Sequence, residues 1–366
     1  MDKGQLSILC LVRLAIGASI SKECSSVLDY YDWNNLSVLS SKQGVSAIVL
    51  DAISKLPEGQ RPPRPLLLQW IGKVAMQEQI YEKHKKAIEE LAAFYEQRGI
   101  SMLLLKGYGC SLSYPKPNHR PTGDIDIYLF GKQHEADELV EKELGIKVYR
   151  EYHKHSVFNF HGVEVENHAK FIDDASHKSN VCYEETLMDV LHERGCLESP
   201  IENMHLPSPT FNSLFLLRHT GEHFAANEII LRHVLDIGTF FQKYHEKVGW
   251  GTVFDVYRKQ RMDRFFDAIA TICVEYLGMD ASCFGSGDGR FSYHSNCDLA
   301  ERILDDIFVE KDFLPMSTSG IDTWGKKLNY GIDKTRRWYT NRWKYELVYN
   351  ESMLESFWWL ARNRMR

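Results

Sequence analysis

The sequence RPTGDIDIYLF, residues 120–130, decides the fold. Asp124 and Asp126 stand one residue apart within an otherwise apolar run. Side chains of a β-strand alternate between its two faces, so the carboxylates share one face while Ile125, Ile127 and Leu129 face a core. Like charges on one strand face repel each other, and a hard divalent cation such as Mg²⁺ prefers carboxylate oxygens. The stretch therefore predicts a strand with a metal site on one face.

The residues around this strand predict a small mixed α/β unit over residues 98–175. A short apolar strand is expected at residues 100–105, and it ends at Lys106-Gly107, where a glycine turn can bring backbone N–H groups to a phosphate. Residues 133–144 have the pattern of a helix that Gly145 ends. Residues 147–152, 156–160 and 163–167 alternate as strands, with a hairpin turn at residues 161–162.

Both flanks of this unit have helical patterns. In the N-terminal region, residues 1–97, we expect a buried helix in the apolar stretch 6–18 and further helices at 25–33, 45–56 and 66–98, the last ended by Gly99. In the C-terminal region, residues 176–366, we expect helices at 214–243 and 261–277. The fold class is therefore α+β, a small mixed sheet flanked by two helical regions.

Charge and cysteine usage narrow the setting of the protein. The net charge of −6 gives no general attraction to nucleic acid or to an anionic membrane. The eight cysteines form no CxxC pair, which predicts free thiols in a reducing compartment. The apolar stretch at residues 6–18 is too short to span a bilayer and lacks the basic start of a signal peptide. These features predict a soluble cytoplasmic protein, and they leave its oligomeric state open.

Residues 324–366 differ from the rest of the chain, because basic residues outnumber acidic ones and tryptophans lie between them. Such a tail can stack on nucleic-acid bases, lie on a membrane surface or bind an acidic partner. It can also form an aromatic helix hairpin that packs on the acidic remainder of the chain. The acidic total makes nucleic acid an unfavoured partner.

Three motifs resemble those of a family of uncharacterised bacterial nucleotidyltransferases within the DNA polymerase β-like superfamily. They are LLLKG at residues 103–107, Tyr114-Pro115, and RPTGDID at residues 120–126. The resemblance covers residues 98–170 and, more weakly, 210–245. It implies a polymerase β-like sheet and a Mg²⁺-dependent enzyme. Such an enzyme moves a nucleoside monophosphate from a nucleoside triphosphate such as ATP to a hydroxyl of a small molecule, a sugar or a protein.

The resemblance also implies a third carboxylate, in a Glu-x-His element on a later strand. Here that element is Glu166-Asn167-His168, and Glu164 on the same strand face is the alternative to Glu166. Asp124 and Asp126 would bridge two Mg²⁺ ions, for which Mn²⁺ can substitute. Glu166 would hold the ion that lowers the pKa of the acceptor hydroxyl, and would accept its proton.

The same resemblance assigns nucleotide contacts. The turn at Gly107 and Tyr108 would present N–H groups to the β- and γ-phosphates, and Lys106 or Arg120 would neutralise developing charge. The superfamily usually has glycine or serine where this chain has Tyr108. A non-catalytic nucleotide sensor with the same fold is therefore the alternative function. The alternative interpretation gives these residues no role in nucleotide binding: Lys106 would be the solvated end of a strand, and Arg120 would form an ion pair with Asp124.

Two further groups of residues have alternative interpretations. Arg232 and Asp236 are four apart on a predicted helix, and an ion pair within the helix is the favoured interpretation. In the other, Arg232 contacts the nucleotide or the acceptor. Four histidines lie on or beside the predicted strands, at positions 153, 155, 161 and 168. They are either ordinary strand residues or ligands of a zinc ion, because imidazoles two residues apart share a strand face.

Overall fold

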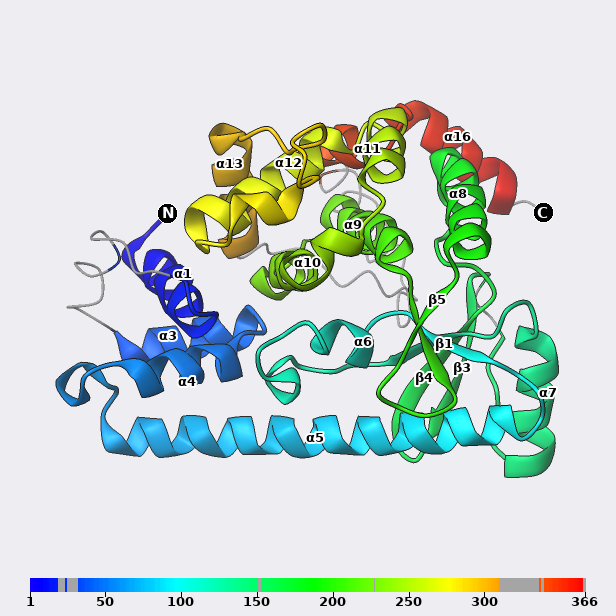
Figure 1. Ribbon diagram of the computed structural model, residues 1–366, viewed down its shortest axis with the longest axis horizontal. Helices are drawn as coiled ribbons and strands as arrows, with labels where there is room; N and C mark the ends of the chain where they lie inside the picture. Colours follow the sequence, from blue (N-terminus) through cyan, green and yellow to red (C-terminus); the bar gives the residue numbers. More distant parts are fainter. Residues whose placement is uncertain are drawn as a thin grey trace, which may run out of the picture.

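The structure is a computed structural model that describes residues 1–18, 24, 32–150, 153–226, 228–309, 336 and 339–364. Within these residues a mixed sheet lies at one end of the long helix α5 (Figure 1). The sheet has the strand order β3-β4-β2-β1-β6-β5. Its strands are β1 (Met102–Leu104), β2 (Ile125–Tyr128), β3 (His155–Phe160), β4 (Val163–His168), β5 (Cys196–Glu198) and β6 (Met204–Pro207). The predicted α+β class is confirmed.

The register of the central strands places the acidic residues together. β2 pairs antiparallel with β1 and parallel with β4, and in the second pairing Asp126 lies opposite Glu166. β3 and β4 form the predicted hairpin, and His161 and Gly162 in its turn both have positive φ. The strand predicted at residues 147–152 is wrong for its described part, because only Tyr149 makes an isolated bridge.

The sheet also contains two strands that the sequence pattern did not predict. β5 and β6 lie in the region expected to be helical, and β6 pairs parallel with β1. Both strands are short, with three and four residues. Such short segments show no usable alternation of apolar and polar residues.

Helices α5 and α7 cover one face of the sheet. The N-terminal helices are α1 (Lys3–Ala15), α3 (Trp33–Lys42), α4 (Ser46–Lys55) and α5 (Arg64–Glu96). The predictions at 6–18, 45–56 and 66–98 are confirmed to within a few residues, and the one at 25–33 falls largely outside the described residues. Buried residues of α5, including Leu91 and Tyr95, pack with Ile125 and Ile127 of β2. α7 (Gln133–Leu144) ends at Gly145 as predicted, with φ +67.

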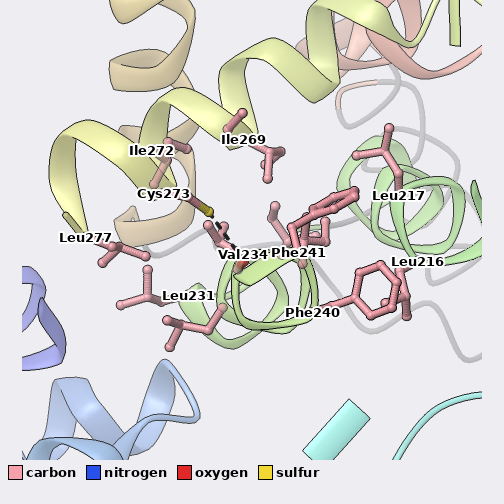
Figure 2. Close-up of a cluster of buried hydrophobic side chains, with 14 of the residues drawn as sticks. Leu216, Leu217, Leu231, Val234, Phe240, Phe241, Ile269, Ile272, Cys273 and Leu277 are labelled. Carbon is pink, nitrogen blue, oxygen red and sulfur yellow. Dashed lines mark hydrogen bonds between the residues drawn. The ribbon is translucent and has the colours of Figure 1, made fainter. Parts of the chain in front are cut away.

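The other face of the sheet, on which the aspartates lie, looks toward the C-terminal helices. These are α8 (Lys178–Arg194), α9 (Pro209–Ala226), α10 (Leu231–Tyr244), α11 (Trp250–Lys259), α12 (Asp263–Thr271) and α13 (Cys297–Phe308). The single helix predicted at 214–243 is therefore two helices. Figure 2 shows Leu216 and Leu217 of α9, Val234 and Phe241 of α10, and Ile269 of α12 in one buried cluster.

Short helices complete the described chain: α6 (Tyr108–Ser111), the 3₁₀ segments Glu58–Gln60, Pro117–His119, His245–Lys247 and Ala281–Phe284, and the π segment Ile272–Tyr276. The last of these continues α12, so the helix predicted at 261–277 is confirmed in outline. No helix of the described residues has the length and apolar character needed to cross a membrane.

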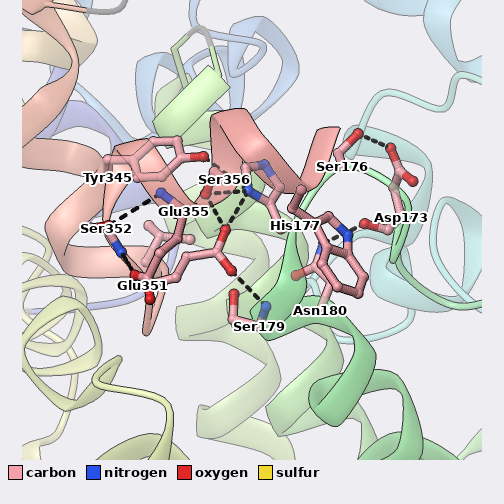
Figure 3. A network of polar contacts seen from close by, with 12 residues as sticks. Asp173, Ser176, His177, Ser179, Asn180, Tyr345, Glu351, Ser352, Glu355 and Ser356 are labelled. Carbon is pink, nitrogen blue, oxygen red and sulfur yellow. Dashed lines mark hydrogen bonds and ion pairs between the residues drawn. The ribbon is translucent and has the colours of Figure 1, made fainter. Parts of the chain in front are cut away.

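The described part of the basic tail packs on the body of the protein. It forms α15 (Arg342–Val348) and α16 (Met353–Arg364). Figure 3 shows the polar network that joins it to the start of α8: Nδ1 of His177 lies 3.0 Å from the Glu351 carboxylate, which also accepts the N–H of Ser179 at 2.7 Å. Buried Arg218 of α9 donates to the Val348 carbonyl. This packing favours the interpretation of the tail as part of the fold, while residues 324–335, 337–338 and 365–366 lie outside the described chain.

Two cysteines correct the expectation of free thiols throughout. Cys10 and Cys24 form a disulfide, and their Cα atoms are 5.5 Å apart. Cys110, Cys182, Cys196, Cys273, Cys283 and Cys297 are free. The prediction of eight free thiols is therefore wrong for one pair, and the cysteines no longer support the prediction of a reducing compartment.

Candidate active site

Three carboxylates meet at the face of the sheet that looks toward α9 and α10. One oxygen each of Asp124, Asp126 and Glu166 lies within 4.8 Å of the other two. The parallel register of β2 and β4 sets Asp126 beside Glu166, and Asp124 immediately precedes β2. Glu164 is exposed, lies opposite Asn159 on β3 and is absent from this cluster. Glu166, and not Glu164, is therefore the third member of this cluster.

Asp126 is the buried member of the cluster, with 3% of its surface exposed. Its Oδ1 lies 2.7 Å from Nζ of Lys106 and 3.0 Å from Nε2 of His168. Burial alone would raise the pKa of Asp126, but the charge of Lys106 and the contact with His168 outweigh this effect and lower the pKa. Burial alone would lower the pKa of Lys106, but the negative charge of the Asp126 carboxylate outweighs this effect and raises the pKa. Lys106 is thus a mostly buried counter-ion of the cluster, with 15% of its side chain exposed, and not a solvated strand end.

The turn at Gly107 places the start of α6 against this cluster. Gly107 has φ +55, and a Cβ built on it would lie 3.2 Å from the Asp124 carbonyl oxygen. The side chain of Tyr108 points away, into the core, where its ring lies 5.5 Å from that of Tyr81. Only the backbone of Tyr108 can therefore serve a ligand at this turn.

We expect Gly107→Ala to destabilise the protein by at least about 1–2 kcal/mol, because positive φ strains a residue with a Cβ. Urea unfolding should show a lower midpoint. Gly72→Ala is the matched control: Gly72 lies within α5 with open space around it, so alanine should leave the midpoint unchanged or raise it. Equal midpoints for Gly107→Ala and the wild type would contradict the strain argument.

Arg120 has a partner other than the one expected. Its Nε and Nη2 donate to the two carboxylate oxygens of Asp236 at 2.9 and 2.8 Å, and Tyr114 Oη donates to the same carboxylate at 2.7 Å. Arg120 and Asp236 are both buried. Arg120 is therefore not the ion-pair partner of Asp124, and Asp236 is not the ion-pair partner of Arg232, so both interpretations are wrong. Local patterns could not reveal the contact between Arg120 and Asp236, because 116 residues separate them.

Arg232 is left facing a pocket. No hydrogen bond or ion pair joins its guanidinium to a described residue, and its Nε is buried without a partner. Burial and the nearby charge of Arg120 lower the pKa of Arg232. The pocket, of about 220 Å³, is also lined by Lys106, Gly107, Arg120, Gly123, Asp124 and Asp126. An unpaired cation and a carboxylate cluster thus line the same pocket.

Three histidines on this pocket were not among the predicted site residues. His219 and His223 come from α9, with ring centroids 4.6 Å apart, and His233 comes from α10, 5.8 Å from His223. Burial lowers the pKa of His219 well below its usual value and lowers that of His233 to about 4. His219 and His233 are therefore neutral at pH 7. The spacing of residues 219 and 223, one helical turn apart, was the available signal.

Comparison with known proteins gives one match. A family model described as "Uncharacterised nucleotidyltransferase" matches residues 29–278, more than half of the chain. The matched range includes the sheet, the three carboxylates and the pocket-lining parts of α9 and α10. No curated protein and no solved structure matched. On its motifs, its mixed sheet and this match, the chain belongs to the family of uncharacterised nucleotidyltransferases.

Proposed function

We propose that the protein transfers a nucleoside monophosphate from a nucleoside triphosphate to a hydroxyl group of a small molecule, a sugar or a protein, with Mg²⁺ as cofactor. One observation carries the proposal: Asp124 and Asp126, which form a carboxylate cluster with Glu166, line a pocket that is also lined by the unpaired Arg232. Carboxylates suit a metal-bound triphosphate, and a free guanidinium suits its phosphates.

The donor set fits the proposed cofactor. The cluster offers three carboxylate oxygens within 4.8 Å of one another, and hard ions such as Mg²⁺ or Mn²⁺ favour oxygen ligands. Asp124, Asp126 and Glu166 would hold the metal, two ions in the usual arrangement of such sites. When bound, the metal supplies positive charge that polarises the phosphate oxygens and lowers the pKa of the acceptor hydroxyl.

In the proposed reaction the acceptor oxygen forms a bond to the α-phosphorus. The bond between the α-phosphorus and the bridging oxygen to the β-phosphorus breaks, and pyrophosphate leaves with the electron pair. Glu166 is the proposed acceptor of the hydroxyl proton. It is only partly buried and its ion-pair contacts are with imidazoles, whereas Asp126 is buried and paired with the ammonium group of Lys106. Arg232 binds the phosphates and orients the triphosphate in the pocket.

For Arg232→Gln we expect a Kd for the triphosphate about 10- to 100-fold higher than in the wild type, since a hydrogen bond to a charged group contributes about 1.5–3 kcal/mol. Calorimetric titration with a non-hydrolysable triphosphate and Mg²⁺ measures this. Arg258→Gln is the control, because Arg258 is exposed on α11 and does not line the pocket. An unchanged Kd in Arg232→Gln would remove Arg232 from the nucleotide site.

The proposal is tested by pyrophosphate release from each of the four common triphosphates with Mg²⁺ and a panel of hydroxyl acceptors. We expect release with at least one donor and acceptor, and its loss in Asp124→Asn. Triphosphate binding without release across the panel would favour the non-catalytic sensor. Absence of binding, with Asp124→Asn indistinguishable from wild type, would refute both functions.

A further inference from the structure

The hairpin of β3 and β4 gathers a second group of ligand atoms next to the carboxylate cluster. One ring nitrogen each of His155 and His168 and one carboxylate oxygen of Glu166 lie within 4.8 Å of one another. From this geometry we propose that His155, Glu166 and His168 bind a divalent transition metal ion such as Zn²⁺. This site has two imidazole ligands that the all-oxygen cluster lacks, and the two sites have Glu166 in common.

The topology of the sheet builds this site. His155 and His168 are direct partners in the antiparallel pairing of β3 and β4, and their ring centroids are 5.2 Å apart. Glu166 lies two residues before His168 on β4, so its side chain is on the same strand face. On one face of an antiparallel pair, the nearest neighbours of a residue are the residue directly opposite it and the residues two positions before and after that one. Three ligands therefore converge without any loop.

The two distances from Glu166 to the histidines lie in the range found between ligands of one ion. Nε2 of His168 lies 3.2 Å from Oε2 of Glu166, and Nε2 of His155 lies 3.6 Å from Oε1. Zinc bonds to nitrogen and oxygen are about 2.0–2.2 Å long, which places neighbouring ligand atoms about 3–3.6 Å apart. The two oxygens of Glu166 face different histidines, so the carboxylate reaches both rings.

The surroundings of His168 prepare its Nε2 for a metal. The ring is fully buried, and Nδ1 lies 3.1 Å from the carbonyl oxygen of Lys170. A hydrogen bond from Nδ1–H to a carbonyl fixes the tautomer and leaves the Nε2 lone pair as the ligand, the usual outer arrangement of metal-bound histidines. In that tautomer the Nε2 lone pair faces the carboxylates of Asp126 and Glu166, and a cation bound between the ring and the two carboxylates would be attracted to all three groups.

Ligand type gives the site its selectivity. Imidazole nitrogen favours zinc, copper, nickel and iron over Mg²⁺, which prefers oxygen. Asp124, by contrast, belongs only to the all-oxygen cluster. The adjoining cavity, of about 220 Å³, is lined by Gln133, Asp137, Arg150 and His155 among others, and it provides an entry path to His155. The other two histidines considered from the sequence are not part of the ligand group: His153 lines the same cavity but is paired with Asp174, and His161 is paired with Glu90.

The test uses Co²⁺ alone, as a spectroscopic probe of imidazole ligation, with the full-length protein and no nucleotide. We expect one Co²⁺ per chain with visible absorption bands, displaced by stoichiometric Zn²⁺ but not by excess Mg²⁺. His155→Ala should weaken binding at least about tenfold, as loss of a ligand or its support does. His153→Ala is the matched control on the same segment, 59% exposed, and should bind as the wild type does.

A second variant separates this site from the proposed catalytic one. Asp124→Asn should keep the Co²⁺ absorption bands, because Asp124 is not a ligand of this site. The Co²⁺ test can therefore succeed even if the protein carries out no nucleotidyl transfer. Circular dichroism of each variant shows that it is folded. The proposal is overturned if the wild type binds no Co²⁺. It is equally overturned if His155→Ala binds Co²⁺ like the wild type.

Discussion

Replacing Glu166 with glutamine should reduce the rate of nucleotidyl transfer by about 10³-fold, whereas replacing Glu164 should leave it within about twofold of the wild type. The two residues are on the same strand and the same face, two positions apart. Glu166 belongs to the carboxylate cluster and is the proposed acceptor of the hydroxyl proton, while Glu164, two residues earlier on β4, is exposed. Pyrophosphate release under saturating triphosphate and Mg²⁺ measures both rates.

The comparison is informative because the same substitution, glutamate to glutamine, is made at both positions. Glutamine preserves the size of the side chain and removes only its charge, so both proteins should fold as the wild type does. A large loss of rate in Glu164→Gln together with a small loss in Glu166→Gln would show that Glu164, and not Glu166, has the proposed role. Equal rates in all three proteins would place the chemistry outside this strand.

The largest expected effect on stability comes from the buried pair of Arg120 and Asp236. Asp236→Ala should lower the free energy of unfolding by about 3–5 kcal/mol, because it leaves the Arg120 guanidinium buried without a counter-ion and removes the acceptor of Tyr114. The Asp236 carboxylate has its pKa lowered, since the charge of Arg120 outweighs the effect of burial. Chemical denaturation followed by fluorescence measures the change.

Arg232→Ala is the contrasting variant, one helical turn away on α10. Its guanidinium has no hydrogen-bond partner in the described chain and is repelled by Arg120, so its removal should leave stability unchanged or raise it. The double variant Arg120→Met with Asp236→Leu should be more stable than Asp236→Ala, because it removes both buried charges. A larger loss of stability in Arg232→Ala than in Asp236→Ala would reverse the assignment of partners.

Local patterns in the sequence predicted the parts of the site that depend on neighbouring residues. Alternation in residues 124–130 gave the strand and the common face of Asp124 and Asp126, and the glycine at 107 gave the turn. The partner of these aspartates, Glu166, came from a family resemblance. Its contact with Asp126 depends on the parallel pairing of β2 and β4, which no local pattern specifies.

Contacts between distant segments account for what was missed. Asp236 joins Arg120 across 116 residues, and i, i+4 spacing pointed instead to Arg232. β5 and β6 are too short to show a period, and β6 is defined by its pairing with β1. The rings of His155 and His168 meet because their strands pair, which sequence spacing alone left as one alternative among several.

The position of the transferred phosphorus tests the central claim most directly. The protein is incubated with Mg²⁺, an acceptor and a triphosphate that is radiolabelled at either the α- or the γ-phosphate, and the products are separated. Nucleotidyl transfer predicts that the α-label joins the acceptor and the γ-label leaves in pyrophosphate, and that both products disappear in Asp124→Asn. Transfer of the γ-label to the acceptor, or product formation that Asp124→Asn does not diminish, would contradict the account.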